Sequence, residues 1–243
     1  MRLRLVCTAA AFAIVAVLAP TGTATADDNP SPTPTASADV TEQFKTSYIG
    51  MADGWVAANA GQPVVATGAG QNYYYDANRA VRGTTKDSKG KTSYMLCHPS
   101  AADGKTTCLT RQKGAKKWLK MTSTVTFDDR AGIAGLIMMY GMYGYGIVSP
   151  ADGAVNITTT GDTTTLVATG TLETKSGDPA AYSFIATSSP TTFTIQLTET
   201  IAGQQTINEN VVTLQRVPVQ KKIMFPSKKL ITTNLMDPGL QGR

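Results

Sequence analysis

The stretch AGIAGLIMMYGMYGYGIV, residues Ala131 to Val148, interrupts an otherwise polar, threonine-rich chain. Its eighteen residues carry no charge and include five glycines, three methionines and three tyrosines. Eighteen residues is the lower limit for a membrane-spanning helix, but glycine weakens a helix, and no tryptophan or basic cluster anchors either end. We therefore expect this segment to be buried within an exported domain, as a helix or a helix pair.

Burial of this segment has two interpretations. Either it is close-packed core, in which glycine permits close approach to a sheet, or its methionines and tyrosines line a cavity for an apolar ligand. The two overlap, because one helix can close a pocket and complete a core. The residues expected to face the sheet and border such a cavity are Ile133, Leu136, Ile137, Met138, Tyr140, Met142 and Tyr143, with Trp55 or Trp118 in the other wall.

Short β-prone runs separated by turn residues lie on both sides of the apolar stretch. They extend from Gln71 to Phe127 and from Val155 to Val217, and their alternation of apolar and polar residues predicts antiparallel meanders. Before them, capping-box spacing and an apolar stripe predict an amphipathic helix from about Asp39 to Asn59. The sequence thus predicts one mostly β, α+β domain over residues 39–243, with roughly nine or ten strands.

The N-terminus has the pattern of a cleaved export signal. Arg2 and Arg4 precede an apolar run, and Ala24-Thr25-Ala26 offers small residues for cleavage, so residues 1–26 are expected to form a signal peptide. A lipidated cysteine would follow the apolar run, whereas Cys7 opens it. We expect a secreted or cell-envelope protein that is not lipidated.

The mature chain is expected to begin with a tether and to contain one disulfide. Residues 27–38 are rich in proline, serine and threonine, which predicts a disordered linker. Cys97 and Cys108 then form an even pair in an oxidising compartment. Direct pairing would place His98 opposite Thr107 and leave a four-residue hairpin loop, Ala101–Gly104.

The charge of the chain argues against nucleic acid as a partner and suggests an anionic membrane or wall surface. Loss of Arg2 and Arg4 takes the formal charge from +5 to +3, which is too low to favour nucleic acid. Two lysine groups are expected to be solvated turns and edges or a contact with an anionic membrane or wall surface. They are Lys113, Lys116, Lys117 and Lys120, and Lys221, Lys222, Lys228 and Lys229.

No set of residues predicts catalysis, a metal or a cofactor. His98 is the only histidine, and it stands beside a cysteine expected to be structural. Asp128 and Asp129 are expected to cap the helix that follows them. Gly68-Ala69-Gly70 precedes a strand instead of joining a strand to a helix, so it does not predict a nucleotide site.

Three segments and the order of elements resemble the LolA/LppX-like proteins of the bacterial cell envelope. The segments are QNYYYDANRAVRGTTK (71–86), KKWLKM (116–121) and QKKIMFPSKKL (220–230), with the apolar insert between the last two. The resemblance implies a curved antiparallel half-barrel plugged by helices, with a cavity for lipid-like molecules. The chain departs from the LppX-like lipoproteins because it lacks their lipidation cysteine.

Two functions follow from the sequence. The first is an exported, monomeric, non-enzymatic protein that binds an apolar ligand between a curved sheet and a helical plug. The alternative is a secreted structural or interaction domain whose insert is fully packed core and which binds no ligand.

Overall fold

The computed structural model describes most of the predicted domain. The described residues are 35–68, 70–78, 80–87, 89–99, 105–126, 129–150, 152–173, 177–201 and 207–241. The predicted signal peptide, residues 27–34 of the predicted linker and the predicted loop Ala101–Gly104 lie outside these ranges.

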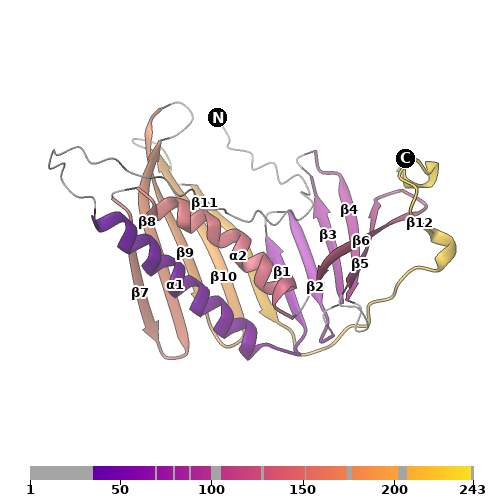
Figure 1. Ribbon diagram of the computed structural model, residues 1–243, viewed down its shortest axis with the longest axis horizontal. Coiled ribbons are helices and arrows are strands. Elements are labelled where there is room, and N and C mark those ends of the chain that lie inside the picture. Colours follow the sequence, from indigo (N-terminus) through magenta and orange to yellow (C-terminus); the bar gives the residue numbers. More distant parts are fainter. Residues whose placement is uncertain are drawn as a thin grey trace, which may run out of the picture.

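Two helices and twelve strands make up the described fold (Figure 1). The helices are α1 (Thr35–Ala58) and α2 (Asp129–Val148). The strands are β1 (Val64–Gly68), β2 (Gln71–Tyr75), β3 (Val81–Lys86), β4 (Thr92–Pro99), β5 (Lys105–Gln112), β6 (Trp118–Thr126), β7 (Ala154–Thr160), β8 (Thr163–Glu173), β9 (Pro179–Ser188), β10 (Thr192–Ile201), β11 (Ile207–Arg216) and β12 (Ile231–Thr232).

All these strands belong to one open, curved sheet with the order β12-β6-β5-β4-β3-β2-β1-β11-β10-β9-β8-β7. Two antiparallel meanders, β1 to β6 and β7 to β11, are joined where β1 pairs with β11. β12 alone among the described strands pairs in parallel, with β6. The prediction of a mostly β, α+β fold is therefore confirmed at the level of one twelve-stranded sheet with two helices.

The predicted strands correspond to β2 through β11, and the sequence analysis missed β1 and β12. β1 has only five residues, begins directly after Pro63 and ends at Gly68, so it lacks a longer alternating run that would mark a strand. β12 has two residues and exists only through its pairing with β6. Both strands depend on contacts between segments far apart in sequence.

α1 begins at Thr35, four residues before the expected start at Asp39. Pro34 is the last helix breaker of the predicted linker, and the residues from Thr35 to Ala38 do not oppose a helix. The end of the predicted linker is therefore helical. At the other end, the Trp55 carbonyl oxygen accepts from both the backbone amide and the side-chain Nδ2 of Asn59, at 3.1 and 2.9 Å.

The two helices pack together on one face of the sheet through aromatic side chains. Phe44 and Tyr48 of α1 stack with ring centroids 5.5 Å apart, and both rings meet Phe184 of β9 edge-on. The Tyr48 hydroxyl donates to the Ile137 carbonyl oxygen of α2 at 2.7 Å. Burial raises the pKa of this hydroxyl far above its ordinary value, so it remains a hydrogen-bond donor.

Two glycines of α2 permit this close contact. A Cβ at Gly141 would collide with the Tyr48 ring, and one at Gly144 would collide with the rings of Phe44 and Phe184. The expectation that glycine allows close approach is confirmed at these positions. No helix in the described parts of the chain has the length and apolar character needed to cross a bilayer.

The opposite face of the sheet is covered by the C-terminal strap, residues 217–241. The strap leaves β11, and the Lys221 amide donates to the Tyr74 hydroxyl of β2 at 2.6 Å. Ile223 is buried in a second apolar cluster with Leu96, Leu109 and Trp118. The strap therefore covers apolar residues that the helices cannot reach.

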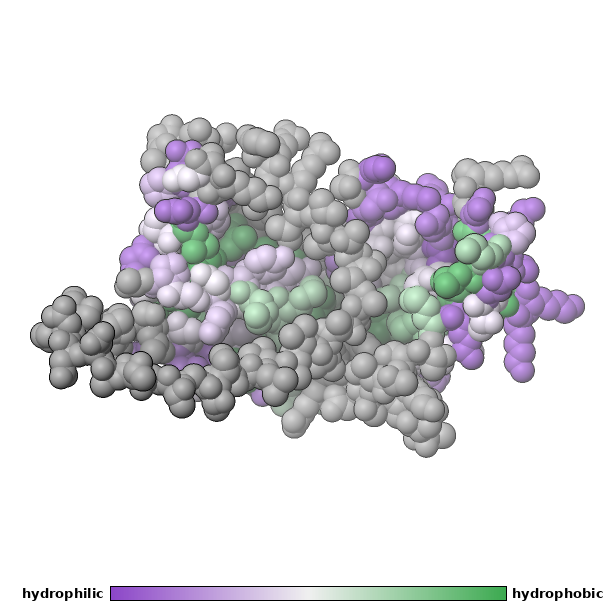
Figure 2. Space-filling view, turned by 45° about the horizontal axis from the view of Figure 1, so that its top comes forward, coloured by the Kyte–Doolittle hydropathy of each residue, from purple (hydrophilic) through white to green (hydrophobic). Residues whose placement is uncertain are grey.

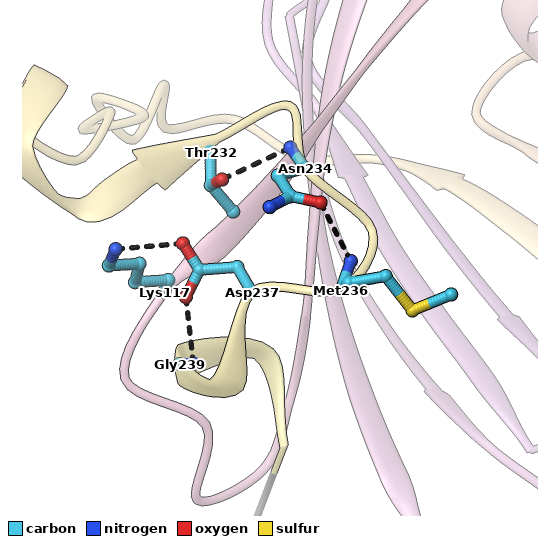
Figure 3. Close-up of polar contacts among 6 residues, drawn as sticks. All are labelled: Lys117, Thr232, Asn234, Met236, Asp237 and Gly239. Carbon is cyan, nitrogen blue, oxygen red and sulfur yellow. Dashed lines mark hydrogen bonds and ion pairs between the residues drawn. The ribbon is translucent and has the colours of Figure 1, made fainter.

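The end of the strap is fastened to the turn between β5 and β6 (Figure 3). The Lys117 Nζ lies 2.8 Å from an Asp237 carboxylate oxygen, and the Gly239 amide donates to the other carboxylate oxygen at 2.8 Å. The Gly239 carbonyl oxygen accepts from the backbone amides of Lys116 and Lys117. The Lys117 ammonium, followed by the Gly239 amide, lowers the pKa of Asp237 below its ordinary value of 3.8.

We predict that Gly144→Ala lowers the free energy of unfolding by about 1–3 kcal/mol, because the added methyl group would displace buried rings. Gly146→Ala is the matched control on the same helix, since a Cβ there meets nothing within 4 Å. It should stabilise the protein by about 0.5–1 kcal/mol through helix propensity. Urea unfolding measures both, and equal effects of the two changes would contradict the packing described.

A second prediction concerns pH. The pKa of Asp237 is lowered in the folded state. Its ion pair therefore contributes fully to the stability of the fold at pH values above the ordinary aspartate pKa, and this contribution is lost as the pH falls through the lowered pKa. The Gly239 amide resonance should titrate below pH 3.8, and Lys117→Met should move the midpoint up towards 3.8. Proton–nitrogen NMR measures this, and a wild-type midpoint at or above 3.8 would show that the ion pair is absent.

Candidate ligand-binding face

Five of the residues expected to border a cavity lie on the packed side of α2. Ile133, Ile137 and Tyr140 are buried in the core beneath the helices. Leu136 and Tyr143 are partly buried and pack against that core. Their orientation towards the interior is confirmed.

Met138 and Met142 were also expected to face the sheet, and this expectation is wrong. Met142 is 68% exposed and Met138 is 38% exposed. The cause lies in the composition of α2, which is apolar on every side, so that no polar face marks the solvent side. Gly141 and Gly144 face the rings of α1, where a Cβ would collide with them, and this contact favours the observed rotation of the helix.

The two tryptophans lie in different apolar clusters. Trp55 is buried under the helices, with its ring centroid 6.0 Å from that of Phe193. Trp118 is buried in the cluster beneath the strap, where the Arg111 guanidinium lies 4.6 Å from its ring centroid. Trp118 therefore cannot form a cavity wall with α2, and that expectation is corrected.

Aromatic and aliphatic side chains fill the space directly beneath the helices. Tyr48, Phe184 and Phe193 are each at most 2% exposed, and Tyr48 and Trp55 meet the Phe193 ring edge-on. Such packing is typical of a protein core. The space directly beneath these helices is therefore filled by core side chains.

Strands β2 to β6 extend beyond both helices, and we call them the open wing. In Figure 1 neither helix crosses β3, β4, β5 or β6. In the described residues, the main sheet contacts of α1 are with β7, β8 and β9, and those of α2 are with β8 and β9. The helix-bearing face of the open wing therefore has no helix above most of it.

Directly opposed apolar residues form a row across this face, from β1 to β6. The first row consists of Val64, Tyr75, Val81, Cys97, Cys108 and Met121, each the register partner of the next. Opposed residues of an antiparallel sheet point to the same face. Val64 belongs to the core beneath the helices, so the whole row shares the helix-bearing face.

A second row lies beside the first. It consists of Ala66, Tyr73, Gly83, Met95, Thr110 and Leu119, again connected by register. The Tyr73 ring lies against Gly83, where a Cβ would collide with it. Two adjacent rows thus give the open wing an apolar surface several strands wide.

The first row stays buried from Val64 to Cys97 and reaches solvent at its far end. Val64 is 0% exposed, Cys97 is 4% exposed, and Met121 at the far end is 46% exposed. Helical geometry places Leu136 and Tyr143 on the flank of α2 that turns away from α1. The apolar surface formed by the two rows therefore begins beside α2 and reaches solvent at β6.

Sequence analysis did not include Tyr73, Met95 or Met121 among the candidate residues. The sequence shows which residues of a strand point to the same face of the sheet. Which of the two faces carries α2 depends on the register of six strands. Cys97 and Cys108 were the one available signal, because a disulfide fixes two neighbouring strands. It is present and places His98 opposite Thr107, as expected.

A polar depression of about 300 Å³ lies near the end of α2, on strands β8 to β10. It is lined by Asp152, Thr169, Gly170, Thr171, Ala181, Tyr182, Ser183, Thr198 and Thr200. Desolvation, with a hydrogen bond to Glu199, raises the pKa of Tyr182 to about 12. Threonine, serine, tyrosine and aspartate side chains make up most of the lining, so the depression does not match the predicted apolar cavity.

The described residues contain no group of three or more side chains suited to hold a metal ion. The His98 ring lies against Phe225 of the strap, with centroids 5.6 Å apart. This histidine therefore belongs to the contact between strap and sheet, on the face opposite the apolar rows.

Comparison with known proteins adds no relative: no family model, curated protein or solved structure matches the chain.

We predict that replacing Cys97 and Cys108 together with alanine lowers the free energy of unfolding by about 2.5–3 kcal/mol, because the unfolded chain loses a closed loop. The bond joins β4 to β5 within the first row, so its loss should also increase amide exchange in the open wing. Urea unfolding and hydrogen exchange measure the two effects. Free thiols at both positions in unreduced protein would contradict the assignment.

Proposed function

We propose that this protein is an exported, non-enzymatic carrier that binds an apolar, lipid-like ligand on the open wing beside α2. The observation that carries the proposal is the pair of apolar rows on β2 to β6, which extends from the buried core to solvent without a covering helix. The rows are buried at Tyr75, Val81 and Cys97 and exposed at Met121, so the apolar surface that reaches solvent lies towards β6. Apolar surface there favours a partner that shields it from water.

The composition of the surface suits an apolar ligand. Met95 and Met121 have flexible, polarisable side chains that adapt to ligands of different shape. Tyr73 and Tyr143 add partly buried rings that pack against the core. No ionised group occurs in either row, so the bound part of the ligand should be uncharged.

The proposal also includes a half-barrel architecture for the sheet. We treat the curved sheet as a half-barrel and its helices as the plug, which is the arrangement that the resemblance to LolA/LppX-like carriers implies. Export with a cleaved signal and without lipidation belongs to the same proposal. It is supported by the Cys97–Cys108 disulfide, a bond typical of oxidising compartments.

The alternative is an exported structural or interaction domain without a ligand. It is favoured by the close packing beneath the helices, where Phe184 and Phe193 are fully buried. In that case the open wing would be an ordinary sheet surface, and its methionines would have no binding role.

We expect wild-type protein, purified without detergent, to carry a copurified apolar molecule in native mass spectrometry and to bind a fluorescent fatty acid. The double change Met95→Gln and Met121→Gln keeps volume and charge but adds polar groups, so it should weaken binding at least about fivefold. Fluorescence titration measures the affinity.

Met142→Gln is the matched control, since Met142 is exposed on α2. It should leave the affinity unchanged. If wild-type protein binds no apolar probe, the alternative function stands. If the control weakens binding as much as the double variant, the ligand lies elsewhere.

A further inference from the structure

Positive charge accumulates at one end of the sheet. Residues 105–126 and 211–241 contain eleven lysines and arginines but a single acid, Asp237, which gives a net charge of +10. The rest of the chain therefore carries −5, since the whole chain carries +5. The two segments are joined in space, because β12 pairs with β6 and the strap is fastened to the β5–β6 turn.

The lysines of this end are available to a partner. Lys113 and Lys116 are exposed in the β5–β6 turn, and Lys228 and Lys229 are exposed in the strap. Asp237 neutralises only Lys117. Most of the positive charge is therefore free to contact an anionic surface.

Large apolar side chains are exposed among these charges. Leu235 and Met236 are 74% and 88% exposed, and Met224 is 80% exposed. In Figure 2 the right end of the molecule shows strongly hydrophobic residues directly beside hydrophilic ones. This mixture distinguishes the surface from an ordinary solvated lysine cluster.

The turn that carries Leu235 and Met236 is held by its own hydrogen bonds (Figure 3). The Thr232 hydroxyl accepts from the Asn234 amide at 3.1 Å, and the Asn234 side chain accepts from the Met236 amide at 3.0 Å. The Asp237 amide donates to the Asn234 carbonyl oxygen. Withdrawing the turn from water would thus leave few backbone groups unpaired.

We propose that this end of the protein docks onto an anionic phospholipid bilayer. Leu235 and Met236 enter the interfacial region, while the lysines of the strap and of the β5–β6 turn contact the headgroups. Apolar insertion combined with lysine contacts is how peripheral surfaces bind anionic lipid. A soluble polyanion would use the lysines but would gain nothing from the two exposed apolar residues.

The test is sedimentation of the purified protein with vesicles. Wild type should bind vesicles of phosphatidylcholine and phosphatidylglycerol in equal parts, and should bind phosphatidylcholine alone much less. Leu235→Ser with Met236→Ser should weaken binding to the mixed vesicles about tenfold. Ile157→Ser is the matched control, because Ile157 is an exposed apolar residue on β7, at the opposite end of the sheet.

A second measurement reports insertion directly. Met236→Cys, labelled with a nitrobenzoxadiazole fluorophore, should brighten and shift to the blue with the mixed vesicles but not with soluble polyphosphate. Absence of vesicle binding overturns the proposal. Equal binding to polyphosphate, with no effect of the Leu235 and Met236 changes and no fluorescence shift, would assign the surface to an anionic polymer instead. The proposal does not depend on ligand carriage, since Met95→Gln with Met121→Gln should leave vesicle binding intact.

Discussion

The hydrogen bonds that β1 makes on both of its edges hold the architecture together. On one edge β1 pairs with β2, its neighbour in sequence, and on the other with β11, which lies near the end of the chain. Val64 and Ala66 are almost completely buried on the helix-bearing face. Without this strand the two meanders would be separate small sheets with exposed edges. With it, the core beneath the helices continues into the apolar rows of the open wing.

A long sheet with two apolar faces needs cover on both, and the chain covers them in different ways. Helices cover one face over β7 to β11, where aromatic rings fill the gap between layers. The strap covers the other face over β2 to β6, burying Trp118 and Leu96. On the helix-bearing side of the open wing, the core extends as far as Tyr75, Val81 and Cys97, and Met121 on β6 remains exposed to solvent. That uncovered surface is a consequence of two helices being too few for twelve strands.

The two proposed surfaces meet at β6. Met121, at the solvent end of the first apolar row, belongs to this strand. On its edge β6 pairs with β12, which leads into the turn carrying Leu235 and Met236. A bilayer contacted by that turn would therefore lie at the same end of the sheet as Met121, where the first apolar row reaches solvent. For a carrier of an apolar molecule, this juxtaposition would shorten the path between lipid and protein, since the ligand would avoid bulk water.

The sequence by itself determined the two helical segments, the strands β2 to β11 and which two cysteines pair. These properties depend on local periodicity and turn residues, and Phe44, Tyr48 and Trp55 lie where the helical stripe placed them. Local sequence patterns could not predict which side of α2 faces the sheet, because a helix that is apolar on every side has no polar face to orient it. Tertiary structure decided that rotation, since Gly141 and Gly144 pack against the rings of α1, where a Cβ would collide with them. It also decided that Trp118 lies under the strap and that Met95 and Met121 share a face with the core. Those outcomes depend on strand register and on pairing between segments up to about 150 residues apart, which no local pattern encodes.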